Sequence, residues 1–203
     1  MHTSTILKII EWLPREINKF KDRVLIFVVS RYWPKKVSPN TITYFRIALT
    51  PIIVLMLFDY EQWRTWIIII FCIGIITDLL DGTVARVFNL QSRTGASLDP
   101  LADKLLIIPL LVFLLQNNKS LLFSIIGVEC LLFCIAIIAL LLKIWTPANL
   151  CGKWKMVFQA IGVLIFLTLD YTPWGIRILW ISVGLGIGSI LGHIQPFLTP
   201  RDN

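Results

Sequence analysis

Charged residues are scarce in this sequence, at 15% of its 203 positions, whereas soluble domains carry about 25%. Hydrophobic residues make up 57%. Together these values exclude a water-soluble globular domain, and we expect an all-α integral membrane protein. The net charge of +7 needs no nucleic-acid partner, because membrane proteins retain Lys and Arg on their cytoplasmic side.

Cysteine and histidine are also rare, with four and two residues respectively. The cysteines (Cys72, Cys130, Cys134 and Cys151) form no CxxC pair and have no histidine cluster nearby. A zinc site or a disulfide framework is therefore not expected, and we interpret them as packing residues. A cleavable signal peptide is not expected either, because charged residues interrupt the first apolar block.

The distribution of apolar residues divides the chain into an N-terminal segment and six apolar stretches. Six stretches are long enough for membrane spans, at about 41–58, 64–86, 97–115, 120–142, 155–172 and 175–196. Residues 1–38 differ, because apolar residues recur there at helical spacing between Lys and Arg residues. We predict an N-terminal amphipathic helix in the membrane interface over 1–38, followed by one six-helix domain over 39–203.

The basic residues predict the orientation in the membrane. With six spans, all of the 19 basic residues except Arg64, Lys119 and Arg177 fall on the side that holds both termini. By the positive-inside rule, this side is the cytoplasm. Four aspartates lie at the cytoplasmic ends of the second and third spans.

The aspartates form two pairs at helical spacing. Asp78 and Asp81 are three residues apart, and Asp99 and Asp103 are four apart, so each pair shares one helix face. A connection of about ten residues makes the two helices antiparallel neighbours. Both pairs can therefore face one gap, where four carboxylates would repel each other unless cations neutralise them.

The chemistry of these side chains indicates the ligands of the gap. Oxygen ligands favour Mg²⁺, Mn²⁺ or Ca²⁺ over zinc, and no His or Cys lies nearby. Gly82 and Gly95 permit close approach of a bulky ligand. Arg86 and Arg93 flank the gap, and arginine with metal suits a pyrophosphate. Interfacial charges without a function, or a divalent-metal transporter, are the alternatives; a transporter would need carboxylates near the bilayer midplane.

The block from 78 to 103 resembles the CDP-alcohol phosphatidyltransferase family, whose motif is D-x2-D-G-x2-A-R-x8-G-x3-D-x3-D. The positions are filled by Asp78, Asp81, Gly82, Ala85, Arg86, Gly95, Asp99 and Asp103. The resemblance implies a six-helix homodimeric membrane fold and transfer of a phosphatidyl group from CDP-diacylglycerol to an alcohol. It implies that the four aspartates bind two divalent cations, and that Asp103 is the general base. Asp78, Gly82, Ala85, Arg86 and Gly95 would bind CDP.

Three further stretches resemble the phosphatidylglycerophosphate synthase branch of this family: Pro39 to Pro51, Leu98 to Lys104 and Gly152 to Gln159. This likeness makes glycerol 3-phosphate the first-choice acceptor. It implies acceptor contacts from Asn40, Thr43, Arg46, Arg93, Glu129, Lys153 and Lys155. The branch has Arg before the acid of the fourth helix, where this chain has Val128. Phosphatidylglycerol, inositol phosphate, serine and an amino alcohol therefore stay open as acceptors.

Two features inside the apolar spans carry further predictions. Glu129 is a carboxylate within a span, which predicts a function or a pairing with Lys153 or Arg46. Gly184, Gly188 and Gly192 recur every four residues, which predicts close helix packing and a candidate dimer interface.

The predicted localisation is a bacterial-type inner or plasma membrane, with the active site and both termini in the cytoplasm.

Overall fold

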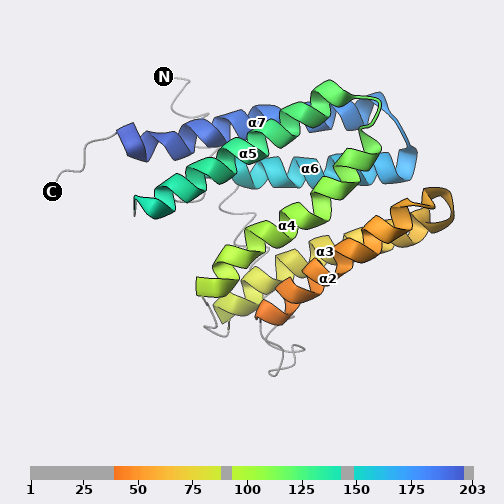
Figure 1. The fold of residues 1–203 in the computed structure, drawn as a ribbon, viewed down its shortest axis with the longest axis horizontal. Helices are drawn as coiled ribbons and strands as arrows, with labels where there is room; N and C mark the ends of the chain where they lie inside the picture. Colours follow the sequence, from red (N-terminus) through yellow and green to blue (C-terminus); the bar gives the residue numbers. More distant parts are fainter. Residues whose placement is uncertain (1–38, 88–92, 143–148, 199–203) are drawn as a thin grey trace, which may run out of the picture. The chain divides into compact units, whose positions relative to one another are not determined.

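The computed structural model describes residues 39–87, 93–142 and 149–198, and the side chains within 41–78, 102–142 and 149–195. These residues form six helices, joined by short turns where the joins are described, and contain no strand. The helices are α2 (Pro39–Leu57), α3 (Tyr60–Val87), α4 (Arg93–Leu114), α5 (Lys119–Leu141), α6 (Leu150–Leu169) and α7 (Pro173–Leu198) (Figure 1). The predicted all-α class is confirmed, while the predicted amphipathic helix over 1–38 lies outside the described residues.

Three of the helices are long and apolar enough to cross a membrane by length and composition. They are α5, α6 and the part of α7 from Pro173 to Gln195. α2 contributes a shorter apolar stretch, Thr41–Leu57. The chain is thus a helical membrane protein with three candidate spans among its described residues, and the count of six spans stays a prediction.

Asparagine side chains mark the start of two helices. Asn118 precedes α5, and its side-chain oxygen accepts a hydrogen bond from the Leu121 amide. Asn149 precedes α6 and accepts from the Gly152 amide at 2.7 Å. Each cap satisfies one of the amides that have no partner within the helix. α6 therefore begins at Leu150, five residues before the predicted span at 155, and includes Lys153 and Lys155.

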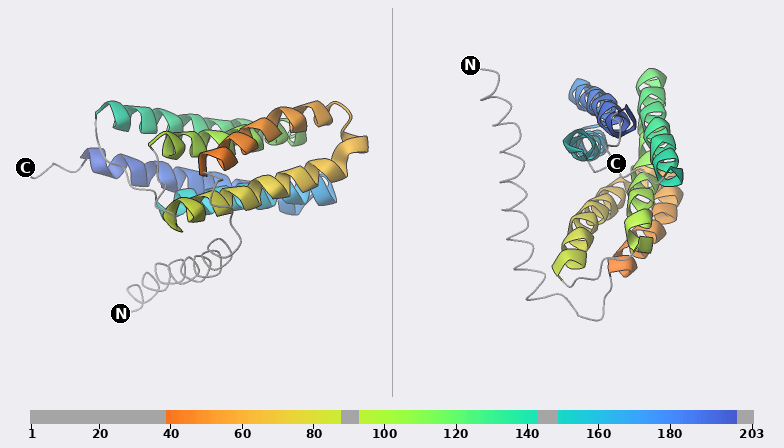
Figure 2. Two further views of the ribbon diagram at one scale, coloured as in Figure 1. Left: turned by 90° about the horizontal axis from the view of Figure 1, so that it is seen from below. Right: turned by 90° about the vertical axis from the view of Figure 1, so that its left-hand side faces the viewer.

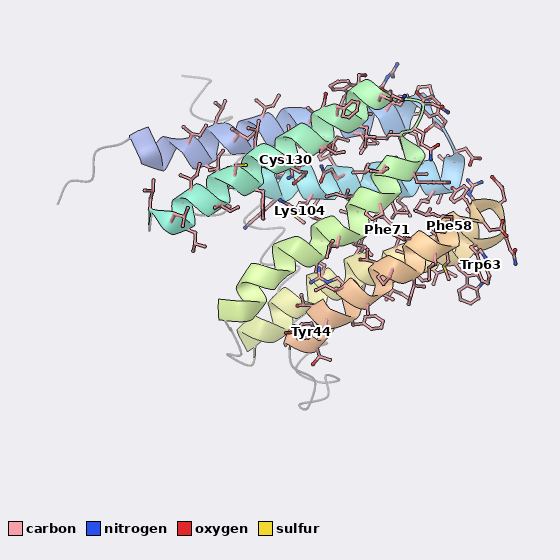
Figure 3. The ribbon with its side chains drawn as sticks, viewed as in Figure 1. Tyr44, Phe58, Trp63, Phe71, Lys104 and Cys130 are labelled. Atoms are coloured by element: carbon pink, nitrogen blue, oxygen red, sulfur yellow. The ribbon has the colours of Figure 1, made fainter. Side chains whose placement is uncertain are left out.

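The described helices fall into two compact units, Met1–Ile53 with Ile69–Leu106, and Val54–Ile68 with Ile107–Asn203. In the first unit, α2, α3 and α4 contribute the buried side chains of Ile53, Phe71 and Ala102. Phe71 is labelled in Figure 3. Gly74 of α3 lies against Leu106 of α4, and a Cβ at this position would collide with the leucine side chain. α3 and α4 therefore approach closely at this position.

In the second unit, α6 and α7 lie side by side in the views of Figure 1 and Figure 2. A Cβ at Gly162 of α6 would be 2.5 Å from Leu179 of α7, so this glycine permits the close packing. α5 packs on α7 and exposes much of its other surface, including Phe123 at 67% and Leu140 at 79%. Large exposed apolar faces of this kind fit contact with lipid.

The glycines of α7 explain part of its packing. A Cβ at Gly188 would be 3.3 Å from the Cys151 sulfur, and one at Gly192 would be 2.8 Å from the Asn149 amide nitrogen. The predicted close helix packing is confirmed at these two positions, and its partner is α6 of the same chain. A Cβ at Gly184 would meet nothing within 4 Å among the described residues. The dimer interface stays a prediction.

An arginine joins the first turns of α3 to the end of α6 in the second unit. The Arg64 Nε donates to the Leu167 carbonyl at 2.7 Å, and Nη2 lies 2.8 Å from Asp170. Asp170 caps α6 with a φ of 57°, so the arginine satisfies a carbonyl that the helix leaves without an amide partner. Burial raises the pKa of the Tyr60 phenol beside it, although the charge of Arg64 opposes this shift.

Candidate active site

One arginine in the first unit contacts two aspartates of the predicted motif. Arg46 lies on α2, and its Nη1 is 2.6 Å from the Asp78 Oδ1 on α3. The same nitrogen donates a hydrogen bond to the Asp103 Oδ1 on α4. Two carboxylates from different helices therefore converge on one nitrogen atom, while the predicted gap shared by all four aspartates stays a prediction.

Exposure differs among these three side chains. The Arg46 side chain is 0% exposed, Asp103 is 13% exposed and Asp78 is 36% exposed. The guanidinium is thus more deeply buried than either carboxylate. The sequence predicted that Arg46 contacts the acceptor, which stays a prediction, and the structure places its cation on the two acids. This contact was not predicted, because the sequence spacing of 32 and 57 residues carries no local signal.

The side chains of the other motif residues lie outside the described part, namely Asp81, Gly82, Ala85, Arg86, Gly95 and Asp99. The backbone is helical at all of these positions. Asp81 follows Asp78 by three residues on α3, and Asp99 precedes Asp103 by four on α4. Each of these residues is therefore about one helical turn from a described aspartate. The side chains of Asn40 and Arg93 also lie outside the described residues, and their acceptor role stays a prediction.

The fit to a divalent cation can be tested on the described carboxylates. Among the described side chains, no group of three His, Cys, Asp or Glu residues lies close enough to hold a metal. Asp78 and Asp103 nevertheless bring two carboxylate oxygens to one cationic nitrogen. These three side chains together carry one net negative charge. Convergent oxygen ligands with surplus negative charge fit Mg²⁺ or Mn²⁺.

A second buried ion pair lies within the second unit. The Lys155 Nζ on α6 is 2.6 Å from the Glu129 Oε1 on α5, with both side chains less than a tenth exposed. The Gln159 amide donates to the same oxygen at 3.0 Å. We predicted that Glu129 pairs with Lys153 or Arg46. The structure pairs it with Lys155, because Lys155 and Gln159 are four residues apart on one buried face of α6.

The other predicted acceptor residues differ in their surroundings. Thr43 is buried on α2 in the first unit, at 1% exposed, and Lys153 is exposed on α6 in the second unit. Gln159 was not among the predicted site residues. Its position four residues after Lys155 is the signal that could have identified it, since a buried amide and a buried cation on one face indicate a shared acidic partner.

A hydrogen-bonded cluster around Asn149 was not predicted either. The Asn149 Nδ2 donates to the Ser189 carbonyl at 2.8 Å, and the Ser189 hydroxyl donates to the Asn149 Oδ1 at 2.9 Å. The His193 Nδ1 lies 2.8 Å from both the Asn149 Nδ2 and the Ser189 carbonyl. These contacts fasten the start of α6 to α7, which explains why Gly188 and Gly192 must be small.

Comparison with known proteins assigns the chain to a family. The sequence model of the family described as CDP-alcohol phosphatidyltransferase matches residues 36–188. This range includes all six motif positions outside the described side chains, together with Asp78 and Asp103. The match therefore covers both the acid motif and the buried Glu129–Lys155 pair.

Individual relatives agree with this assignment. An Arabidopsis thaliana protein named CDP-diacylglycerol–glycerol-3-phosphate 3-phosphatidyltransferase 2 is 31% identical, over 77% of this chain and 78% of its own length. Two bacterial relatives are named CDP-diacylglycerol–glycerol-3-phosphate 3-phosphatidyltransferase. The protein from Salmonella choleraesuis is 39% identical and the one from Escherichia coli K12 is 37% identical, each over 40% of this chain and 46% of its own length. The chain belongs to the CDP-alcohol phosphatidyltransferase family.

Proposed function

We propose that this protein transfers the phosphatidyl group of CDP-diacylglycerol to a hydroxyl of glycerol 3-phosphate and releases CMP. The family match and the names of the relatives support this reaction. The observation that carries the proposal is the convergence of Asp78 and Asp103, from α3 and α4, on a single nitrogen. Family membership alone would leave open whether the motif residues of this chain meet in space.

In the proposed reaction, the acceptor oxygen attacks the phosphorus that carries diacylglycerol. A new phosphorus–oxygen bond forms there, and the bond from this phosphorus to the CMP oxygen breaks. Asp103 accepts the proton of the attacking hydroxyl, and the electron pair of the broken bond leaves with CMP. A partly exposed carboxylate suits this role, because the base must lie within hydrogen-bond reach of the substrate.

Asp78, Asp81, Asp99 and Asp103 would hold two Mg²⁺ or Mn²⁺ ions. When bound, such ions neutralise the pyrophosphate and stabilise charge that develops on the attacking and leaving oxygens. Asp78, Gly82, Ala85, Arg86 and Gly95 would bind the CDP group. The small residues among them allow close approach of the nucleotide, and Arg86 offers a fork of donors that matches a phosphate.

The acceptor role of the second unit depends on the Glu129–Lys155 pair. Lys155 supplies a cation for the acceptor phosphate, while Glu129 and Gln159 fix the position of its ammonium group. Exposed Lys153 supplies a second cation on α6. Because Glu129 compensates the charge of Lys155, acceptors without a phosphate remain outcomes of the test below.

We further propose a membrane arrangement for the whole chain. All six helices α2 to α7 would cross the bilayer, and residues 1–38 would form an amphipathic helix in the interface. Both termini and the acid motif would face the cytoplasm of a bacterial-type inner or plasma membrane, and the protein would be a homodimer. The distribution of basic residues and the apolar surface of α5 support this arrangement.

The acceptor is tested with purified protein, CDP-diacylglycerol, Mg²⁺ and a panel of alcohols. The panel contains glycerol 3-phosphate, phosphatidylglycerol, inositol phosphate, serine and an amino alcohol. We expect CMP release to rise well above the buffer control with glycerol 3-phosphate. A rate equal to buffer with this acceptor, and a higher rate with another, would replace the proposed substrate and keep the family's reaction.

A further inference from the structure

We propose that Arg46 is a built-in counter-ion of the acid motif, which competes with divalent cations for Asp78 and Asp103 and makes no contact with the acceptor. The inference rests on the metal site of the proposed function. It deepens that function by giving the site an internal cation that sets how tightly metal binds. Arg46 is in this sense a positioning residue.

The three side chains of this contact differ in how deeply they are buried. Arg46 has no exposed surface, whereas Asp78 is 36% and Asp103 is 13% exposed. Solvent and small ligands therefore reach the carboxylates more readily than the guanidinium. A phosphate group of the acceptor would have to displace Asp78 or Asp103 from the Arg46 Nη1. An acceptor contact is therefore the weaker interpretation of this residue.

The charge of Arg46 acts in opposite directions on the carboxylates and on a divalent cation. The guanidinium attracts each carboxylate with one unit of charge, so it stabilises two acids that would otherwise repel each other. A divalent cation on the same carboxylates would repel Arg46 with twice the charge product at equal distance. Arg46 must therefore oppose metal binding electrostatically while it stabilises the acids in the absence of metal.

Two substitutions of Arg46 can distinguish the effect of its charge from the effect of its hydrogen bonds. Arg46 uses one nitrogen for both carboxylate oxygens. Glutamine can still donate a hydrogen bond from a buried side chain but carries no charge. Lysine keeps the charge and loses the planar fork of donors. The pair Arg46→Gln and Arg46→Lys therefore tests the charge itself.

The experiment measures Mn²⁺ binding to purified protein by electron paramagnetic resonance, without CDP-diacylglycerol or acceptor. We expect Arg46→Gln to bind Mn²⁺ about tenfold more tightly than the unmodified protein, because a repelling charge is removed. Arg46→Lys should stay within about threefold of the unmodified protein, since its charge is retained.

Thermal unfolding with and without Mn²⁺ supplies a second readout. Arg46→Gln should unfold at a lower temperature without metal and show a larger stabilisation by Mn²⁺, since tighter binding stabilises more. Arg64→Gln is the matched control, because Arg64 also pairs with an aspartate and lies in the other unit. It should lower the unfolding temperature equally with and without Mn²⁺.

Three results would overturn the inference. Equal or weaker Mn²⁺ binding by Arg46→Gln, with normal binding by the unmodified protein, would reject the counter-ion role alone. A higher KM for glycerol 3-phosphate in Arg46→Gln, at unchanged Mn²⁺ affinity, would return Arg46 to the acceptor site. Absence of Mn²⁺ binding in the unmodified protein would reject the proposed metal site together with the inference. A wrong acceptor would leave the Mn²⁺ result unchanged.

Discussion

The two buried ionic clusters of this protein differ in their charge balance. In the first unit, Arg46 meets two aspartates, so the described cluster carries a surplus negative charge. In the second unit, Glu129 meets one lysine and one neutral amide, so that cluster is balanced. Exposure follows the same division, because Asp78 is 36% exposed whereas Glu129 and Lys155 are 9% and 6% exposed.

The difference in charge balance indicates that the two clusters have different roles. An ion pair that is balanced and closed to solvent contributes to a unique arrangement of helices but adds little net stability over apolar residues. A cluster whose acids outnumber its bases, with a partly exposed carboxylate, can accept a further cation from a substrate or a metal. We therefore assign the chemistry of transfer to the Asp78–Asp103 cluster, and to the Glu129–Lys155 pair the positioning of the Lys155 cation proposed for the acceptor.

The largest effect should come from the unbalanced cluster. Asp103→Asn should lower the rate of CMP release by about 10³-fold or more, since it removes both a base and a metal ligand. Binding of CDP-diacylglycerol should be largely retained. The control is Asp170→Asn, which changes an aspartate outside the proposed site. Near-normal turnover in Asp103→Asn would show that the assignment of the general base is wrong.

The balanced pair should respond differently to single and double substitution. Lys155→Met leaves Glu129 buried without its cation and should lower the free energy of unfolding by about 3–5 kcal/mol. Glu129→Leu combined with Lys155→Met should recover most of this loss, as measured by unfolding in detergent.

If Lys155 also contacts the acceptor, the stable double variant should show a raised KM for glycerol 3-phosphate. A double variant that is as unstable as Lys155→Met would contradict the view that the pair is a balanced structural element.

The smallest effect should come from the neutral member of the second cluster. Gln159→Leu removes one hydrogen bond to a carboxylate, at 3.0 Å, and should cost about 1.5 kcal/mol of unfolding free energy. Exposed Gln116→Leu is the matched control and should change stability by less than about 0.5 kcal/mol. A loss as large as that of Lys155→Met would mean that the amide, and not the ion pair, holds α5 to α6.

Much of the fold could be predicted from apolar runs. Each of the six predicted ranges overlaps one of the helices α2 to α7, since a long apolar stretch favours a helix. Three of these helices are candidate membrane spans, and the count of six spans stays a prediction. The start of α6 was placed five residues too late, at 155 instead of Leu150. The capping asparagine at 149 is the local signal that marks the true start.

The site could be predicted only where its residues are close in sequence. The spacing of Asp78, Asp81, Asp99 and Asp103 sufficed to predict a shared gap, and Asp78 and Asp103 do converge. The partners of Arg46 and Glu129 lie 26 to 57 residues away. Such contacts depend on how helices pack, and the local pattern of charges does not encode this.

The most direct test follows labelled glycerol 3-phosphate into lipid, with CDP-diacylglycerol, first in EDTA and then after Mg²⁺ is added. The account predicts one labelled lipid per CMP released, with transfer only after Mg²⁺ is supplied. Label that stays in the water-soluble fraction while CMP is released, or equal transfer in EDTA, would contradict it.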